Sequence, residues 1–193
     1  EVMPYYSSFN TSKKILKQTK WKYERKDYVW QQIVKNKIHN QAMVLKNLNI
    51  DNYEKLLEFE NQVMLGDKTN REGHAAKVYF NLLFGKDFIR GTDNNINSSL
   101  DYGYAIILST MNKEIVSKGY ITPLGINHKS EFNQFNLACD LMEPFRPLID
   151  KIVYENCNRE LNLNQKYKLI DVLNNKIEIA HKDQCVGNSI PIY

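Results

Sequence analysis

The sequence is poor in cysteine, and the few cysteines present are not paired. Cys139, Cys157 and Cys185 are odd in number and widely spaced, with no CxxC pair among them. Disulfide frameworks use even numbers of cysteines, and cysteine zinc sites use closely spaced pairs. The pattern argues against both, and we expect reduced, buried thiols.

Long apolar runs are absent as well. No run reaches the roughly eighteen apolar residues of a membrane-spanning helix, so no membrane association is expected. The first residues, EVMPYYSSFN, lack the charged and apolar regions of a secretory signal, which favours a cytoplasmic protein. Because the chain begins at Glu1 rather than Met, we expect a piece of a longer protein.

Several catalytic signatures are also missing. The sequence contains no GxxxxGK[ST], no GxGxxG after a strand, no HExxH, no GxSxG, and no adjacent His-Asp pair of the kind found in helical metal phosphohydrolases. What remains is a small set of acids with one well-placed histidine. Oxygen-rich ligands with a single imidazole favour Mg²⁺ or Mn²⁺ over zinc.

Apolar residues recur at helical spacing along most of the 193 residues, which predicts a mainly α fold. We expect one multi-helix domain over residues 1–193, with at most a short β element near the C-terminus. The predicted helices are a short one from about residue 11, a long one after a break and up to about Leu48, and further ones over 53–64, 70–85, 96–118, 135–150 and 166–175. A short strand is predicted within 176–185.

The stretch at residues 135–150, FNLACDLMEPFRPLID, combines an apolar stripe with two neighbouring acids. At about 100° per residue, four residues share one helical face that should point into a core: Leu141, Phe145, Leu148 and Ile152. Asp140 and Glu143 lie side by side on another face, where their charges repel unless a cation, typically a divalent metal, sits between them.

The simpler interpretation of this acid pair is a solvated acidic turn, since charged residues mostly face water. Pro144 and Pro147 favour the metal hypothesis, because proline inside a helix removes a hydrogen bond and a plain surface helix would not keep two. A kink at these residues would change the direction in which the Glu143 side chain points. Alternatively, Pro147 marks the start of a second helix.

The segment from Lys13 to Lys26 is strongly basic. It holds seven basic residues and one acid, with Trp21 inside it and Tyr28 just beyond. Basic side chains among aromatic ones suit a nucleic acid, whose phosphates and bases they can contact. A solvated face with its aromatic residues turned into the core explains the pattern equally well.

Two further residues are placed by local patterns. Glu72 falls in the first turn of the predicted 70–85 helix, and His74 points about 200° away, so one metal could not easily take both. His74 is therefore expected to be a packing or surface histidine. His128 follows Pro123 and Gly125, which places it on or beside a turn, where functional groups are often presented.

Four motifs give the chain a specific resemblance to a known family. They are NREGHAAKVYF around Glu72, LDYGYAIIL at residues 100–108, GINH ending at His128, and FNLACDLMEPFRPLID. In this order, and after MPYYSSFN near the start, they resemble the CRISPR-associated integrase, protein one of the adaptation module, and most closely its type II branch. The resemblance covers essentially the whole chain.

The resemblance implies a set of site residues. By motif matching, Glu72, His128 and Glu143 would be the catalytic ligands of Mg²⁺ or Mn²⁺, with Asp140 as a supporting acid. Arg71 and Arg146 beside these motifs are candidate DNA contacts, although either could instead be tied up in internal ion pairs. Basic residues of the N-terminal segment complete the candidate DNA-binding set: Lys13, Lys14, Lys17 and Arg25.

The implied activity is that of a metal-dependent DNA integrase and endonuclease, which joins a spacer 3′ hydroxyl to the CRISPR repeat by transesterification. The implied partners are DNA, CRISPR-associated protein two, and a second copy of the full-length protein. Two departures stand out. Asp101 replaces the family's usual Asn, and residues 1–20 do not resemble the family's β-rich N-terminal domain. The alternative hypothesis is a helical nucleic-acid-binding module without catalysis.

Overall fold

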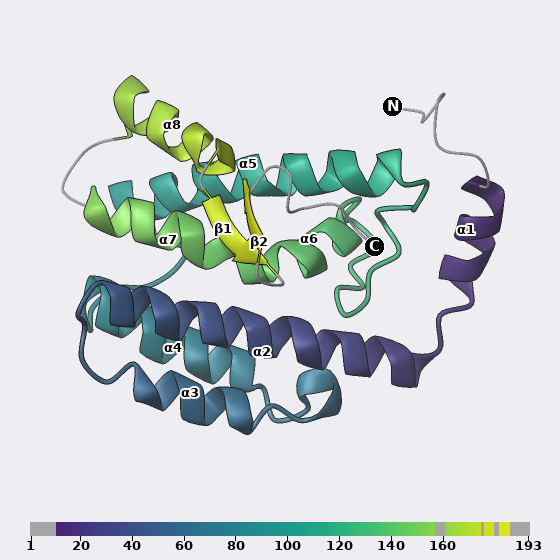
Figure 1. Cartoon of the computed structure of the whole chain (residues 1–193), viewed down its shortest axis with the longest axis horizontal. Helices are drawn as coiled ribbons and strands as arrows, with labels where there is room; N and C mark the ends of the chain where they lie inside the picture. Colours follow the sequence, from purple (N-terminus) through teal and green to yellow (C-terminus); the bar gives the residue numbers. More distant parts are fainter. Residues whose placement is uncertain (1–10, 157–160, 175, 180–181, 186–193) are drawn as a thin grey trace.

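The computed structural model describes residues 11–156, 161–174, 176–179 and 182–185, and this part of the chain is mainly helical, as expected (Figure 1). The α-helices are α1 (Thr11–Thr19), α2 (Tyr23–Asn47), α3 (Glu54–Asn61), α4 (Arg71–Phe84), α5 (Asn95–Ser117), α6 (Asn136–Met142), α7 (Arg146–Glu155) and α8 (Leu163–Ile170). Short 3₁₀ helices are η1 (Leu65–Asp67), η2 (Glu143–Phe145) and η3 (Asp171–Asn174), and the strands are β1 (Lys176–Ile179) and β2 (Lys182–Cys185). The domain extent of residues 1–193 stays a prediction.

The run α6–η2–α7 lies between α2 on one side and α5 on the other (Figure 1), and it contacts both helices. The predicted single helix over 135–150 is therefore three pieces. Pro144 and Pro147 lie at the starts of η2 and α7, so the proposal that Pro147 begins a second helix is confirmed. Proline is tolerated there because the first turn has no helical acceptor for its missing N–H.

The predicted apolar stripe is confirmed only in part, since its four residues pack against the core without being fully buried. The four stripe residues are only half-buried, and the fully buried face is instead made by Leu137, Ala138, Met142, Ile149 and Val153. A 3₁₀ turn has about three residues instead of 3.6, so three residues of η2 shift the helical phase by about 60°. Asp140 and Glu143 are 0% and 4% exposed, which rules out a solvated acidic turn.

The N-terminal segment is tied to the loop that leads to His128. The buried Gln18 of α1 donates to the carbonyls of Ile121 and Leu124 at 2.7 and 3.1 Å and accepts from the Ile121 N–H at 2.8 Å. Lys14 and Lys26 donate to further carbonyls of the same loop, at 2.8 and 2.9 Å. These hydrogen bonds join parts of the chain that are about a hundred residues apart.

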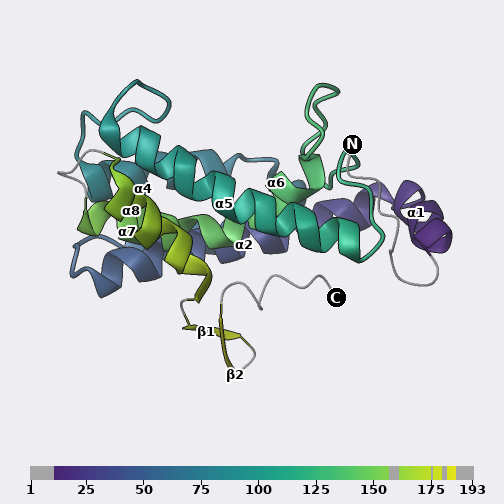
Figure 2. The same ribbon diagram turned by 90° about the horizontal axis from the view of Figure 1, so that it is seen from above.

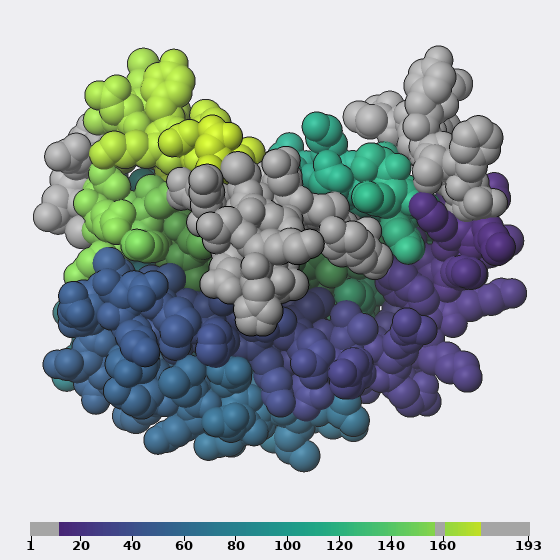
Figure 3. All heavy atoms as spheres, in the orientation of Figure 1, coloured from purple at the N-terminus to yellow at the C-terminus, as the bar shows by residue number. Residues whose placement is uncertain are grey.

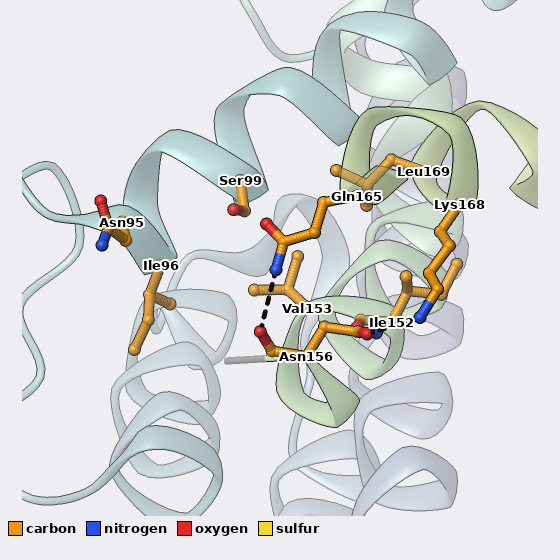
Figure 4. Close-up of a pocket in the computed structure, with 9 residues that line it drawn as sticks. All are labelled: Asn95, Ile96, Ser99, Ile152, Val153, Asn156, Gln165, Lys168 and Leu169. Carbon is orange, nitrogen blue, oxygen red and sulfur yellow. Dashed lines mark hydrogen bonds between the residues drawn. The ribbon is translucent and has the colours of Figure 1, made fainter. Parts of the chain in front are cut away.

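The C-terminal elements lie at the edge of the helical body. After α8, β1 and β2 form an antiparallel hairpin with Ile177 opposite Gln184, where a single strand was expected (Figure 2). Between α5, α7 and α8 is a small cavity of about 10 Å³, beside which the Gln165 side chain donates to the Asn156 carbonyl at 3.2 Å (Figure 4). This space suits one water molecule at most, so it is a packing feature.

Other expectations from the sequence can be compared with the described residues. Cys139 is a free, half-buried thiol, whereas Cys157 and the side chain of Cys185 lie outside the described part. No helix among the described residues is long and apolar enough to cross a membrane. Asp101 contacts the guanidinium of Arg90.

Substituting Gly103 with Ala tests how closely α5 and α7 pack. Alanine usually stabilises a helix by about 0.5–1 kcal/mol relative to glycine, but a Cβ at Gly103 would overlap the Ile149 side chain. Overpacking of this kind costs about 1–3 kcal/mol. We expect Gly103→Ala to lower the free energy of unfolding in urea, while exposed Ser109→Ala changes it little. A stabilised Gly103→Ala variant would contradict the packing described.

Candidate metal centre

Glu72 is positioned by the capped start of α4. The Asp67 carboxylate accepts from the backbone N–H groups of Arg71 and Glu72 at 2.8 and 3.0 Å. The Asn70 side chain accepts from the N–H of Gly73 at 3.2 Å. The first N–H groups of a helix have no partner within it, and these side chains supply one. Glu72 therefore projects from a fixed helix start.

Lys37, near the middle of α2, places its ammonium between two carboxylates. Its Nζ is 2.6 Å from Glu72 Oε1 and 2.5 Å from Glu143 Oε2. The side chains of Lys37 and Glu143 are only 12% and 5% exposed, so this ion pair is shielded from water. Two acids from distant parts of the sequence thus converge on one cation.

Arg146 supplies a second positive charge. Its Nε donates to Glu143 Oε1 at 2.9 Å, and its guanidinium carbon lies 4.5 Å from the centre of the Tyr104 ring. Burial alone would raise the pKa of Glu143, but the charges of Lys37 and Arg146 outweigh it and hold that pKa below its usual value. Glu143 is therefore anionic at neutral pH.

Asp140 holds the loop that carries His128. Its buried carboxylate accepts from three successive backbone N–H groups, those of Ile126 at 2.5 Å, Asn127 at 3.1 Å and His128 at 3.1 Å. The same carboxylate lies 2.6 Å from His128 Nδ1. One aspartate thus fixes both the backbone and the ring of His128.

The charge of His128 follows from these contacts. The hydrogen bond to Asp140 raises the pKa of His128; burial opposes this, and the charges of Asp140, Glu143 and Glu72 add to it. The ring also meets Trp30 edge to face, with centroids 6.0 Å apart. Because Nδ1 is engaged by Asp140, Nε2 is the ring nitrogen left for a ligand.

The predicted site residues are therefore brought together in part. Glu72 and Glu143 converge on the Lys37 ammonium, and the negative charges of both glutamates raise the pKa of His128. Within the part of the chain that the structure describes, however, no three acid, histidine or cysteine side chains surround one metal position. The Lys37 ammonium lies between the two glutamates. His74 is exposed, as predicted.

Sequence reasoning missed Lys37, although the pattern held a signal for it. The buried face of α2 includes Val34, Ile38 and Leu45, and Lys37 and Gln41 fall on that same face. A lysine on a buried helical face is rarely left without an acidic partner. That signal predicts an internal ion pair but not which acids form it.

A cavity of about 230 Å³ adjoins the ion pairs. Lys37 and Glu143 form one side of it, and the buried Asp150, which accepts a hydrogen bond from the Tyr104 hydroxyl, forms another. Burial raises the pKa of Asp150 to about 7, against the opposing effects of its tyrosine hydrogen bonds and nearby cations. The remaining wall residues are Gln41, Phe80, Arg90, Tyr104 and Arg146.

The candidate DNA-binding residues differ in their surroundings. Lys13, Lys17 and Arg25 are exposed, whereas Lys14 donates to the Lys118 carbonyl at 2.8 Å. The N-terminal segment as a whole forms the purple end of the molecule in Figure 3. Of the two arginines, Arg146 is held in the ion pair with Glu143. The guanidinium of Arg71 lies 5.9 Å from the Phe59 ring centre.

A family model described as CRISPR associated protein Cas1 matches residues 3–171 of this chain. A CRISPR-associated endonuclease Cas1 from Neisseria meningitidis is 39% identical over 184 residues, an alignment that covers 92% of this chain and 60% of that protein. The chain thus spans about three fifths of the length of that relative.

Solved structures resemble the fold. A casposase bound to its integration product matches with a TM-score of 0.76 at 19% identity, covering 94% of this chain and 66% of that one. A chain of a Cas6-RT-Cas1–Cas2 complex matches with a TM-score of 0.71 at 21% identity, covering 96% and 25%. At these identities the likeness establishes the fold alone.

Replacing Asp140 with Asn tests its structural role. Asn keeps one oxygen acceptor, but its NH₂ group would face backbone N–H groups that are themselves donors. At least one N–H that Asp140 now accepts from would therefore lose its partner. We expect a loss of about 2–3 kcal/mol in the free energy of unfolding, measured with urea. The exposed Glu131→Gln in the same loop should change it by less than about 0.5 kcal/mol. Equal stability of the two variants would contradict this role of Asp140.

Proposed function

We propose that this chain, which belongs to the family of CRISPR associated protein Cas1, carries the metal-dependent centre of a DNA integrase and endonuclease. One observation carries the proposal: Glu72 and Glu143 converge on a single cation, close to a histidine that Asp140 holds in place. Because the chain spans 60% of the Neisseria relative, the activity of the whole protein is part of the proposal.

The donor set fits Mg²⁺ or Mn²⁺. Two carboxylates and one imidazole are oxygen-rich, as these metals prefer, and a histidine hydrogen-bonded to a carboxylate through its other nitrogen is common among metal ligands. Glu72, His128 and Glu143 would hold the ion. When bound, it would neutralise phosphoryl charge and lower the pKa of the attacking hydroxyl.

The proposed reaction is a transesterification of DNA. The 3′ oxygen of a spacer precursor forms a bond to a phosphorus of the CRISPR repeat, and the bond from that phosphorus to the repeat's own 3′ oxygen breaks. The attacking hydroxyl loses one proton and the leaving oxygen gains one, so charge balances. With water in place of the hydroxyl, the same centre would act as an endonuclease.

The chain's own residues position and neutralise the reacting groups. Asp140 engages Nδ1 of His128, which leaves Nε2 for the metal. Arg146 orients Glu143 through Nε, and its terminal nitrogens have no hydrogen-bond partner in the part of the chain that the structure describes. Since Arg146 also lines the cavity beside Glu143, these nitrogens can bind a phosphodiester oxygen there.

DNA, CRISPR-associated protein two and a second copy of the full-length protein are the proposed partners. The casposase neighbour is bound to an integration product, and another neighbour is a Cas6-RT-Cas1–Cas2 complex, which supports the first two. The identity with the Neisseria relative supports the type II assignment made from the motifs.

A helical nucleic-acid-binding module without catalysis is the second candidate. The Lys37 ammonium between the two glutamates favours it, because an internal ion pair would explain these acids without a metal. So do the exposed Lys13, Lys17 and Arg25, which have the exposed aromatic rings of Tyr23 and Tyr28 nearby. The two candidates differ in whether Glu72, His128 and Glu143 are needed for activity.

Strand transfer separates the two candidates. With Mn²⁺, we expect the chain, or its full-length form, to join a 3′-hydroxyl duplex to a supercoiled target. Glu72→Gln, His128→Ala and Glu143→Gln should each reduce the rate on the order of 100-fold or more, because each removes a metal ligand. The exposed Glu131→Gln should leave it unchanged. Full activity in all three ligand variants would leave only the binding module.

Metal binding should also depend on pH. A metal-bound His128 must be neutral, and its pKa is raised above 6.5, so protons compete with the metal. We expect the Mn²⁺ affinity to fall about tenfold per pH unit below that pKa, measured by electron paramagnetic resonance. The free energy of unfolding without metal has the opposite pH dependence. Because the pKa of His128 is raised in the folded chain, this residue contributes stability below pH 6.5, and that contribution is lost as the pH rises through the folded-state pKa. An affinity that stays constant down to about pH 5 would exclude His128 as a ligand.

Salt dependence tests the basic segment. Each phosphate contact contributes about one unit to the slope of log K against log salt concentration. Changing Lys13, Lys17 and Arg25 together to Gln should therefore reduce the slope by up to about three for duplex DNA. A matched triple change to Gln of Lys55, Lys77 and Lys113, which are also exposed, should leave the slope unaltered. Equal slopes in both triple variants would remove the segment from the DNA interface.

A further inference from the structure

We infer that Lys37 is a displaceable internal cation: a divalent metal that enters between Glu72 and Glu143 moves the Lys37 ammonium into the adjoining cavity, toward Gln41. This role rests on the metal site proposed above. In the metal-free chain the lysine keeps the two acids assembled, and in the metal-bound chain it contributes its charge elsewhere.

The contacts of Lys37 require such an exchange. Its Nζ lies within 2.6 Å of one carboxylate and 2.5 Å of the other, at the position where an ion shared by Glu72 and Glu143 would sit. Two cations cannot occupy one position, and their repulsion is strong where water is excluded. A metal that takes both glutamates must therefore move the ammonium away.

The adjoining cavity offers a second position for the Lys37 ammonium. It measures about 230 Å³ and has Lys37 and Glu143 in its wall, so the lysine side chain already borders it. Lysine suits this movement because its charge lies at the end of a flexible four-carbon chain. The wall provides acceptors in Gln41 and Asp150, which are 2% and 1% exposed.

Gln41 is the proposed receiving group. Its side-chain Oε1 is buried and has no hydrogen-bond donor among the described residues, although a buried acceptor without a donor is costly. Gln41 follows Lys37 by one helical turn of α2, so the two side chains are neighbours on the same face. An ammonium arriving from Lys37 would satisfy this oxygen.

The displaced charge would also affect the DNA site. Arg90 and Arg146 already line the cavity, each close to the Tyr104 ring, at 5.3 and 4.5 Å from its centre. Once its ammonium leaves the two glutamates, the charge of Lys37 is no longer neutralised by them, and three unneutralised or partly neutralised cations would face the space next to Glu143. Metal binding would thereby strengthen the attraction for a phosphate group in the cavity.

Mn²⁺ binding to Lys37→Met tests the displacement directly. Methionine keeps most of the volume of lysine but removes the competing charge, so we expect Mn²⁺ to bind at least tenfold more tightly than to the unaltered chain, by electron paramagnetic resonance. In EDTA the variant should melt at a lower temperature, because Glu72 and Glu143 lose their cation, and Mn²⁺ should raise its melting temperature more than that of the unaltered chain. Lys35→Met on the same helix, whose side chain makes neither contact, is the matched control and should bind Mn²⁺ normally.

The outcomes separate this role from the metal site itself. Mn²⁺ binding by the unaltered chain that is equal or stronger than in Lys37→Met would overturn the displacement and leave the metal site intact. Failure of both proteins to bind Mn²⁺ would overturn the metal site and the displacement together.

Gln41→Leu provides a second test that keeps the ion pairs. Removing the receiving oxygen should weaken Mn²⁺ binding roughly fivefold, about the effect of one hydrogen bond, while stability in EDTA is unchanged or higher because a buried unpartnered acceptor is gone. An unchanged Mn²⁺ affinity in Gln41→Leu would overturn the movement of Lys37 toward Gln41.

Discussion

Two largely buried carboxylates cannot remain charged side by side without a cation, and this constraint organises the molecule. Glu72 and Glu143 share the ammonium of Lys37, and Arg146 supplies a second positive charge to Glu143. Burying charges is costly unless their partners are well placed. Three separate devices place them: the cap that Asp67 gives to α4, the prolines that start η2 and α7, and the central position of Lys37 on α2.

Most of the helices follow from local patterns in the sequence. A break between α1 and α2 was predicted without its position, whereas the extents of α4 and α5 were predicted within a residue or two, because both helices have clear periodicity and an Asn cap. The stretch from 135 to 150 could not be predicted in the same way. Its two prolines permitted either a kinked helix or a new start, and the three residues of η2 turned a different face toward the core.

The site was predicted from motif resemblance more than from physics. Asp140 illustrates the limit: helical spacing paired it with Glu143, yet it instead holds the backbone and ring of His128. Such contacts depend on the loop of residues 126–128 folding over α6, which no local pattern encodes. Lys37 was missed because its partners come from α4 and η2, and only the tertiary fold brings these together.

The central claim is that Glu72, His128 and Glu143 form a metal site, and that the Lys37 ammonium lies where the metal would bind. Anomalous X-ray diffraction from crystals of this chain soaked in Mn²⁺ tests it most directly. The account predicts a manganese peak between Glu72 and Glu143, within bonding distance of His128 Nε2, with the Lys37 side chain turned toward Gln41. A crystal in which Lys37 still bridges the two glutamates, and manganese binds elsewhere or not at all, would contradict it.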